Sequence, residues 1–337
     1  MGHLTKTAVT PGQEAALQLL RGARSVLLTG HQRPDGDCLG AQAALSQVLT
    51  ALGKTVTRLN PDPPEPRYDF LAARCPFPAW VPGDALPEHD LCVLLDCSEL
   101  TRTGPLCELF EAASSSKLVI DHHVYEGDVW WDAAFVDEHC AATGLLVHRI
   151  AKLLEVQIDM VAAMGIFTSL VADTGWFRYG NTDAETLSVA SELVAIGVQP
   201  DVLFGEIFQN HPAEHPSRVA RMLNRVEYFA DGRLALADLP LSEADGLEPV
   251  DTDDVHDLLR SVAQVEVVLL LQELEPEVSK LSARSKTSYN VAALAQCFGG
   301  GGHRRAAGAT LHGALADTRQ ELLDAALVLF EREGKLA

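Results

Sequence analysis

The sequence contains no run of about 18 apolar residues, the length that a membrane-spanning helix requires. Its opening stretch, MGHLTKTAVTPGQEAALQLL, also lacks the cationic segment followed by an apolar one that marks a secretory signal. Lys6 breaks the pattern that directs N-terminal myristoylation. These absences predict a cytoplasmic protein with no membrane partner.

Paired cysteines and positive charge are both scarce. The seven cysteines are odd in number and have no C-x-x-C spacing, which argues against a disulfide framework and predicts reduced, mostly buried thiols. Lys and Arg number 26 against 47 Asp and Glu, which gives a formal net charge of −21. So acidic a chain disfavours the coating of a long nucleic acid, because that function needs many cations against the phosphates.

One stretch, residues 278–316, has no acidic residue at all. Its cations are Lys280, Arg284, Lys286, Arg304 and Arg305. A cationic segment in an acidic chain predicts a receptor for a small polyanion.

The same stretch contains four consecutive glycines, 299–302, so that Gly300, Gly301 and Gly302 lead directly into His303. Two interpretations stay open. Glycine lets backbone amides approach a phosphate closely, with His303 adding charge, but a flexible loop would have the same composition. No Gly-Lys-Ser/Thr ends the run, so it is not a Walker loop.

Elsewhere, buried strands run directly into acidic or imidazole side chains. The residues that follow SVLLTG, LCVLL and KLVI are, in that order, His31 with Asp35 and Asp37, then Asp96, then Asp121 with His122 and His123. The carboxyl ends of parallel strands meet at one edge of a sheet, so these side chains should converge. Carboxylates gathered in this way destabilise a fold unless cations intervene. Oxygen and imidazole ligands suit Mn²⁺, Mg²⁺ or Zn²⁺, and we expect Mn²⁺.

At 337 residues the chain exceeds the size at which a single core usually stops growing, so we expect two domains. Residues 1–196 predict an α/β domain with a doubly wound, mainly parallel sheet, because expected strands and helices alternate. The strands are expected at 25–30, 55–60, 91–96 and 117–121, and the helices at 14–24, 38–53, 141–155 and 159–172. The last helix ends at Asp173, which would face the same edge of the sheet.

The rest of the chain predicts a linker and a smaller unit. Residues 197–225 are punctuated by proline and predict a helical linker. Residues 226–337 predict a smaller α/β domain, with strands at 233–239, 265–274 and 279–286 and a helix at 290–298.

Five motifs follow one another along the chain: HQRPDGDCLG, LLDCSELTR, IDHH, VADTG and GGGGHRRAAG. With them, nearly the whole sequence resembles the DHH phosphoesterase superfamily, in the branch that carries a DHHA1 second domain. The modest length and the FRYGNT segment resemble the oligoribonuclease and 3′-phosphoadenosine-5′-phosphate phosphatase type, or nano-RNase, more than the longer RecJ exonucleases.

The resemblance implies a role for each motif residue. It implies two metal ions, one held by His31, Asp35 and Asp173, the other by Asp37 and His122, with Asp96 bridging both. Such a pair activates a water and offsets charge on a phosphoryl group. The resemblance further implies that His123 contacts the scissile phosphate or protonates the leaving oxygen, that Asp121 orients an imidazole, and that Arg284, His303 and the glycines bind the substrate.

The implied function is a Mn²⁺-dependent phosphoesterase, with Mg²⁺ or another divalent ion as the alternative metal. It would hydrolyse RNA or DNA dinucleotides to pentanucleotides into mononucleotides, and 3′-phosphoadenosine-5′-phosphate into AMP, with substrate between the domains of each subunit of a homodimer. Two alternatives stay open. One is a hydrolase of another small phosphorylated ligand, such as the linear product of a cyclic dinucleotide. The other is a nucleotide-binding module without turnover, which would be expected to lack a metal ligand, whereas all six expected ligands are present.

Overall fold

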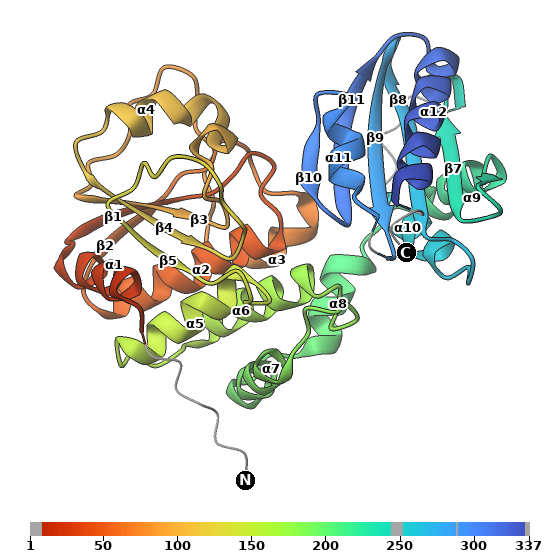
Figure 1. The fold of residues 1–337 in the computed structure, drawn as a ribbon. Helices are drawn as coiled ribbons and strands as arrows, with labels where there is room; N and C mark the ends of the chain where they lie inside the picture. The colour runs from red at the N-terminus through yellow and green to blue at the C-terminus, as the bar shows by residue number, and fades with distance from the viewer. Residues whose placement is uncertain (1–8, 244–251, 288, 334–337) are drawn as a thin grey trace. The chain divides into compact units, whose positions relative to one another are not determined.

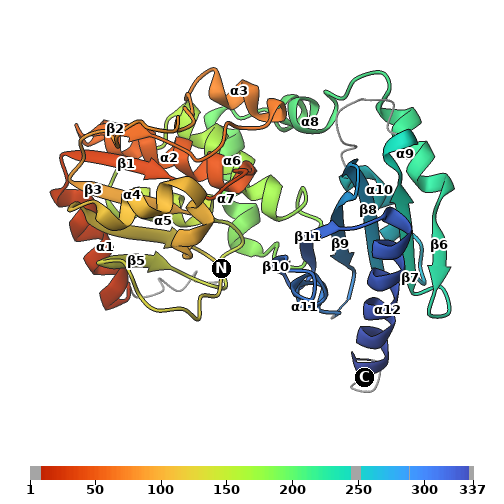
Figure 2. The same ribbon diagram turned by 90° about the horizontal axis from the view of Figure 1, so that it is seen from above.

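A computed structural model of the chain describes residues 9–243, 252–287 and 289–333, apart from the side chains of His303 and Glu333. The chain divides into two compact units, residues 1–210 and 211–337 (Figures 1 and 2). The division falls inside the segment 197–225 that the sequence assigns to a linker. Each unit is described by itself below.

Unit 1 contains a five-stranded sheet with the order β2-β1-β3-β4-β5, in which every neighbouring pair is parallel. The strands are β1 (Ser25–Thr29), β2 (Thr55–Arg58), β3 (Leu91–Leu95), β4 (Ser116–Asp121) and β5 (Ala133–Val136). The α/β class and the mainly parallel sheet are therefore confirmed. Strand β5 was missed, because two of its four residues are alanines, which are depleted in strands.

Helices cover both faces of this sheet (Figure 1). The α-helices of unit 1 are α1 (Pro11–Gly22), α2 (Gly36–Ala51), α3 (Asp69–Ala72), α4 (Cys107–Ala112), α5 (Thr143–Leu153), α6 (Met160–Asp173), α7 (Ala184–Ile196) and α8 (Pro200–Phe208). Two short 3₁₀ helices occupy Pro66–Tyr68 and Leu100–Leu106. Successive residues of β1 point to opposite faces of the sheet. Val26 and Leu28 pack against α1, α2, α5 and α6, whereas Leu27 packs on the other face, in the same cluster as residues of α4.

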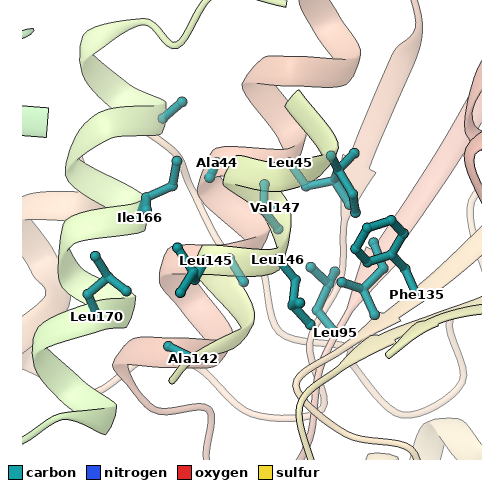
Figure 3. Packing of buried hydrophobic residues seen from close by; sticks show 14 of the residues in the cluster. Ala44, Leu45, Leu95, Phe135, Ala142, Leu145, Leu146, Val147, Ile166 and Leu170 are labelled. Atoms are coloured by element: carbon teal, nitrogen blue, oxygen red, sulfur yellow. The ribbon is translucent and has the colours of Figure 1, made fainter. Parts of the chain in front are cut away.

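The larger of these two cores lies between the sheet and helices α2, α5 and α6. Figure 3 shows Leu145 and Leu146 of α5 between the sheet residue Leu95 and the α6 residues Ile166 and Leu170. All five side chains are fully buried. Burial of a Leu or Ile side chain stabilises a fold by about 1.5–3 kcal/mol. This core fixes the three helices that deliver and support the site described below.

Helices α2 and α6 approach each other at paired glycines. A methyl group at Gly40 would collide with the carbonyl oxygen of Gly165, and one at Gly165 would lie 2.6 Å from the carbonyl oxygen of Gly40. Only glycine therefore permits this spacing of the two helix backbones.

Unit 2 is built on a six-stranded mixed sheet with the order β10-β11-β9-β8-β7-β6, in which only β7 and β8 are parallel (Figure 2). Its strands are β6 (Glu227–Phe229), β7 (Leu234–Leu239), β8 (Val267–Glu275), β9 (Val278–Ser285), β10 (Gly301–His303) and β11 (Ala306–His312). Its helices are α9 (His215–Asn224), the 3₁₀ helix Leu241–Glu243, α10 (Asp253–Arg260), α11 (Val291–Gln296) and α12 (Leu315–Glu333).

The sheet of unit 2 also buries both faces. Leu269 packs with α11 and α12, whereas its neighbours Val268 and Leu270 pack with α9 and α10. The expected strands at 233–239, 265–274 and 279–286 correspond to β7, β8 and β9. The hairpin β10–β11 and the long helix α12 were missed; glycine and alanine dominate the hairpin, and both residues are depleted in strands.

All seven cysteines are free, and five of them are buried. Burial raises the pKa of the Cys92 thiol to about 12, so it stays protonated at neutral pH. Within the described ranges, no single helix is long and apolar enough to cross a membrane. The pair α7 and α8 meets that criterion by length and composition alone, with a bend of 105° between the two helices.

Replacing Gly40 by alanine should destabilise unit 1 by about 1–3 kcal/mol, because the added methyl group forces α2 away from α6. Urea unfolding of the metal-free protein measures the effect. The matched control is Gly22→Ala at the end of α1, where an added methyl group meets nothing within 4 Å. Equal stability of the two variants would show that the helices do not pack as described.

Candidate metal centre

Three neighbouring strands of unit 1 end at the same edge of the sheet. The register places Thr29 beside Leu94 and Leu95 beside Ile120. The next side chains therefore emerge close together, namely His31 after β1, Asp96 after β3, and Asp121, His122 and His123 at the end of β4. The strand order reverses between β1 and β3, the place where open α/β sheets bind ligands.

A first set of potential metal ligands comes from the loop after β1 and from Asp96. His31 Nε2 lies 3.5 Å from Asp96 Oδ2 and 4.0 Å from Asp35 Oδ1. His31 Nδ1 donates to the carbonyl oxygen of Gln32 at 2.8 Å, which fixes the ring and directs Nε2 toward the carboxylates. The set therefore combines one imidazole nitrogen with two carboxylates.

Asp35 has a second task as the N-cap of α2. Its Oδ1 accepts from the backbone N of Asp37 at 3.0 Å and of Cys38 at 3.1 Å. This cap starts the helix at Gly36, two residues before the expected start at 38. As a result, Asp37 lies in the first helical turn, buried beneath the site.

A second set consists of Asp37, His122 and Asp173, whose ligand atoms all lie within 4.8 Å of one another. His122 Nε2 is 3.4 Å from Asp37 Oδ2 and 3.0 Å from Asp173 Oδ2. His122 Nδ1 is bound to the carbonyl oxygen of Cys140 at 3.0 Å. Nε2 is buried and makes no hydrogen bond of good geometry within the described part of the chain. A buried nitrogen aimed at two carboxylates in this way fits a metal ion.

The position of Asp173 changes the division of ligands that the family resemblance implied. That division placed Asp173 with His31 and Asp35. The structure instead groups Asp173 with Asp37 and His122, because α6 ends beside the end of β4. We therefore assign Asp173 to the second set.

Asp96 lies between the two sets. Its Oδ2 faces His31 Nε2 at 3.5 Å, and its Oδ1 is 3.6 Å from His122 Nε2. The residue has a φ of 60°, in the left-handed region, and its backbone N donates to Ile120 O at 3.0 Å. The bridging position expected of Asp96 agrees with this geometry.

The side chains of the two sets shift one another's protonation. Burial, and then the Asp96 carboxylate, raise the pKa of Asp37 to about 8. Burial and the Asp37 carboxylate raise the pKa of Asp173 to about 6. Burial lowers the pKa of His122, but its contact with Asp173 and the charge of Asp37 outweigh burial and raise that pKa to about 11. Without a metal ion, bound protons therefore offset the negative charge of the carboxylates. A bound cation would take over that role and release the protons.

The donor set favours hard or borderline divalent ions. Four carboxylates and two imidazoles suit Mn²⁺, Mg²⁺ or Zn²⁺. Cys38 Sγ also lies within reach of His31 and Asp96. Burial raises the pKa of the Cys38 thiol well above its usual value, and Gln42 donates to its sulfur. The carboxylates and imidazoles around Asp96 form a complete donor set without Cys38, so we do not assign Cys38 as a ligand.

Partners that the sequence analysis missed support Asp37 and Asp96. The backbone N of Thr143 and of Gly144, at the start of α5, donate to the two oxygens of Asp37 at 2.8 and 3.1 Å. The hydroxyl of Ser169 donates to Asp37 Oδ1 at 2.5 Å, and Thr143 Oγ1 donates to Asp96 Oδ1 at 3.1 Å. The only sequence signal was a pair of hydroxyl residues in apolar helices, which is also common at purely structural positions.

His123 is oriented as a second imidazole beside the ligands. Its Nδ1 donates to Asp121 Oδ1 at 2.6 Å, so Asp121 holds the ring as expected. Asp121 Oδ2 accepts from Ser98 Oγ at 2.6 Å. Burial by itself would raise the pKa of Asp121, but its hydrogen bonds with His123 and Ser98 outweigh burial and lower that pKa. His123 Nδ1 also lies 3.6 Å from Asp96 Oδ1, beside the centre.

The expected substrate residues of unit 2 lie on adjoining strands. The register pairs Arg284 of β9 with Ala306 of β11, and Ala306 with His303 of β10. Arg284 is partly buried and lies 3.4 Å from Asp253. The side chain of His303 lies outside the described part of the structure.

The glycine run leads into a hairpin, with Gly301 and Gly302 in strand β10, paired with β11. A methyl group at Gly300 would collide with the carbonyl oxygen of Gly308, and Gly302 has a φ of 137°. These two glycines are therefore needed for strand packing and backbone conformation. A methyl group at Gly301 would meet nothing within 4 Å, so the space beside its Cα is open.

Two family models match the chain. Residues 25–197 match the DHH family, N-terminal domain, and residues 233–332 match the DHHA1 domain. The chain is 34% identical to the "Bifunctional oligoribonuclease and PAP phosphatase NrnA" of Thermus thermophilus, over 92% of each chain. A protein of the same name from Mycoplasma pneumoniae is 25% identical, over 88% of this chain and 90% of that one.

A solved structure shares the fold of the whole chain. It is an exopolyphosphatase-related protein from Bacteroides fragilis, which aligns with a TM-score of 0.86 at 22% identity. The alignment covers 96% of this chain and 97% of that one.

The revised division of ligands predicts that Asp35 and Asp173 serve different ions. Asp35→Asn keeps a helix cap and should weaken one Mn²⁺ site, and Asp173→Asn should weaken the other, each by at least about 10–100-fold. Equilibrium dialysis with metal analysis should find one tightly bound ion in each single variant and none in the double variant. If the double variant keeps as many ions as the single variants, both residues serve one ion and the division is wrong.

Proposed function

Because the chain belongs to the DHH family and carries a DHHA1 domain, we propose that it is a Mn²⁺-dependent phosphoesterase of very short oligonucleotides. Its relative from Thermus thermophilus is named for oligoribonuclease and PAP phosphatase activities. On this proposal the chain cleaves RNA or DNA dinucleotides to pentanucleotides into mononucleotides. It also removes the 3′-phosphate of 3′-phosphoadenosine-5′-phosphate to give AMP.

The two ligand sets that meet at Asp96 are the observation that carries the proposal. Asp96 faces His31 through one oxygen and His122 through the other. When bound, two divalent ions there would activate water and offset charge on a phosphoryl group. A nucleotide-binding module without turnover needs no such arrangement.

The residues around the centre hold it in place before substrate arrives. The amides of Thr143 and Gly144 and the hydroxyl of Ser169 fix both oxygens of Asp37. Hydrogen bonds of this kind are worth about 0.5–1.5 kcal/mol each, and together they orient Asp37 without a ligand. Such fixed ligands keep the reacting groups at one geometry during the reaction.

His123 would contact the phosphate that is cleaved. Its Nδ1 donates to Asp121 at 2.6 Å, which fixes the orientation of the ring, so a phosphate would meet the opposite edge of the ring, at Nε2. An imidazole held in this way can donate to a phosphoryl oxygen, or give its proton to the leaving oxygen. Ser98 anchors Asp121 from the other side and so keeps the pair aligned.

Charge favours a small substrate. A formal charge of −21 repels a long polyanion, whereas a dinucleotide needs only a few favourable contacts. Arg284 provides a planar, bidentate donor for a phosphate group, and Gly301, with open space beside its Cα, lies in the same sheet. The homodimer, the cytoplasmic location and the role of His303 stay predictions.

With Mn²⁺, the protein should hydrolyse a dinucleotide and 3′-phosphoadenosine-5′-phosphate faster than a 24-nucleotide RNA or pyrophosphate. Asp96→Ala should lower kcat by at least about 100-fold, the scale of losing one contact that stabilises the transition state. Product release, followed by chromatography, measures both. The control is Asp84→Ala, which removes an exposed carboxylate of unit 1.

Three results would contradict this proposal. Cleavage of pyrophosphate alone would point to a different small-phosphate hydrolase. Binding of nucleotides without turnover by the Mn²⁺-loaded protein would point to a sensing module. Equal activity of wild type and Asp96→Ala would place the chemistry elsewhere.

Arg284→Ala should raise KM for the dinucleotide by about 10–100-fold, because it removes a charge-assisted hydrogen bond worth about 1.5–3 kcal/mol. Metal content should not change, since the residue belongs to unit 2. Lys280→Ala, an exposed cation on the same strand, is the matched control and should leave KM within about twofold. Loss of bound metal in Arg284→Ala would contradict the assignment of this residue to substrate binding.

A further inference from the structure

A second group of metal-ligating side chains lies in unit 2, away in sequence from all the ligands described above. It consists of His211, His215 and Asp254, with one ligand atom of each within 4.8 Å of the others. His215 is the first residue of α9, His211 precedes it by four positions, and Asp254 lies in the first turn of α10. The two helices contact each other within the unit (Figure 2).

The three side chains already form a contiguous cluster. His215 Nε2 lies 2.6 Å from Asp254 Oδ2, and the rings of His211 and His215 are stacked with centroids 3.9 Å apart. His215 is 7% exposed, whereas the side chain of Asp254 is 54% exposed. The cluster therefore has a buried imidazole, that of His215, at its centre, and the side chains of His211 and Asp254 can change position around it.

We propose that His211, His215 and Asp254 bind a Zn²⁺ ion. Two imidazole nitrogens and one carboxylate oxygen are a donor set of open, tetrahedral zinc sites, in which water or another exchangeable ligand occupies the fourth position. Hard ions such as Mg²⁺ prefer sets made of oxygen alone. This imidazole-rich cluster is therefore better suited to Zn²⁺ than to Mg²⁺.

Binding requires two small rearrangements. Zn–N and Zn–O distances are about 2.0–2.2 Å, so Nε2 of His215 and Oδ2 of Asp254 must move from a hydrogen bond to a separation of about 3 Å. Nε2 must be free of hydrogen to bind the ion, so the neutral ring changes to the tautomer that has its hydrogen on Nδ1, by proton exchange with solvent. The His211 ring must also turn out of its stack, because the lone pair of a ring nitrogen lies in the ring plane. His211 lies outside the helices and Asp254 is exposed, so both can move.

The surroundings leave room for the fourth ligand. A hollow of about 450 Å³, open to solvent, borders His215 and Asp254 and is lined further by Leu258 and Ser261. An ion in this place would join the first residue of unit 2 to helix α10. It would therefore stabilise unit 2 against unfolding in proportion to its occupancy.

Zinc stoichiometry tests the proposal. After equilibrium dialysis against micromolar Zn²⁺, metal analysis should find one ion fewer per chain in His211→Ala than in wild type. His211→Cys, which keeps a zinc ligand, should retain the wild-type number, as should the control His139→Ala in unit 1. This difference in zinc content does not depend on how many ions unit 1 binds. The experiment therefore tests the zinc site independently of the proposed function.

Thermal unfolding provides a second readout that a folding defect cannot imitate. Zn²⁺ added to the Mn²⁺-loaded protein should raise the unfolding temperature of unit 2 in wild type but not in Asp254→Asn. The two proteins should unfold at about the same temperature without Zn²⁺, because Asp254 is exposed. Equal zinc content in wild type and His211→Ala, or an equal zinc-induced rise in wild type and Asp254→Asn, would overturn the proposal.

Discussion

The burial of negative charge at one edge of a sheet is the constraint on which unit 1 depends. Asp37 is completely buried and Asp96 nearly so, yet both must face the same small space. Burying unpaired carboxylates is costly, and the chain offsets that cost with the amides at the start of α5, the hydroxyls of Thr143 and Ser169, and the imidazoles of His31 and His122. Cations complete the compensation. The same charges that destabilise the metal-free centre would favour the binding of divalent ions there.

The packing of the helices sets the geometry of the site. Ser169 reaches Asp37 because α6 lies against α2 at Gly40 and Gly165, and against α5 at Gly144. A methyl group on Gly144 would collide with the hydroxyl of Ser169. Glycines at helix crossings thus determine the distance between a carboxylate and its donors, although none of them contacts a metal ion or substrate.

Much of this could be predicted from the sequence, because strand ends in a parallel sheet share an edge. His31, Asp96 and His122 were placed together on that argument alone, and the family matches agree with the resemblance to DHH phosphoesterases. The grouping of Asp173 was wrong, since no sequence rule says beside which strand a helix ends. Thr143 and Ser169 were missed because a hydroxyl in an apolar helix gains its meaning only from what packs opposite. For the glycines before His303 the sequence leaves a flexible loop and a phosphate-binding segment open, and the hairpin could not be predicted because the close approach of Gly300 to Gly308 depends on the pairing of the strands.

The backbone of Asp96 restricts evolution at that position independently of chemistry. A φ of 60° is costly for most side chains, and least so for glycine, asparagine and aspartate. Neutral drift away from aspartate is therefore channelled toward asparagine or glycine. A related protein that has lost the metal ligands should therefore still have aspartate, asparagine or glycine at this position, because the left-handed turn at the end of β3 requires it.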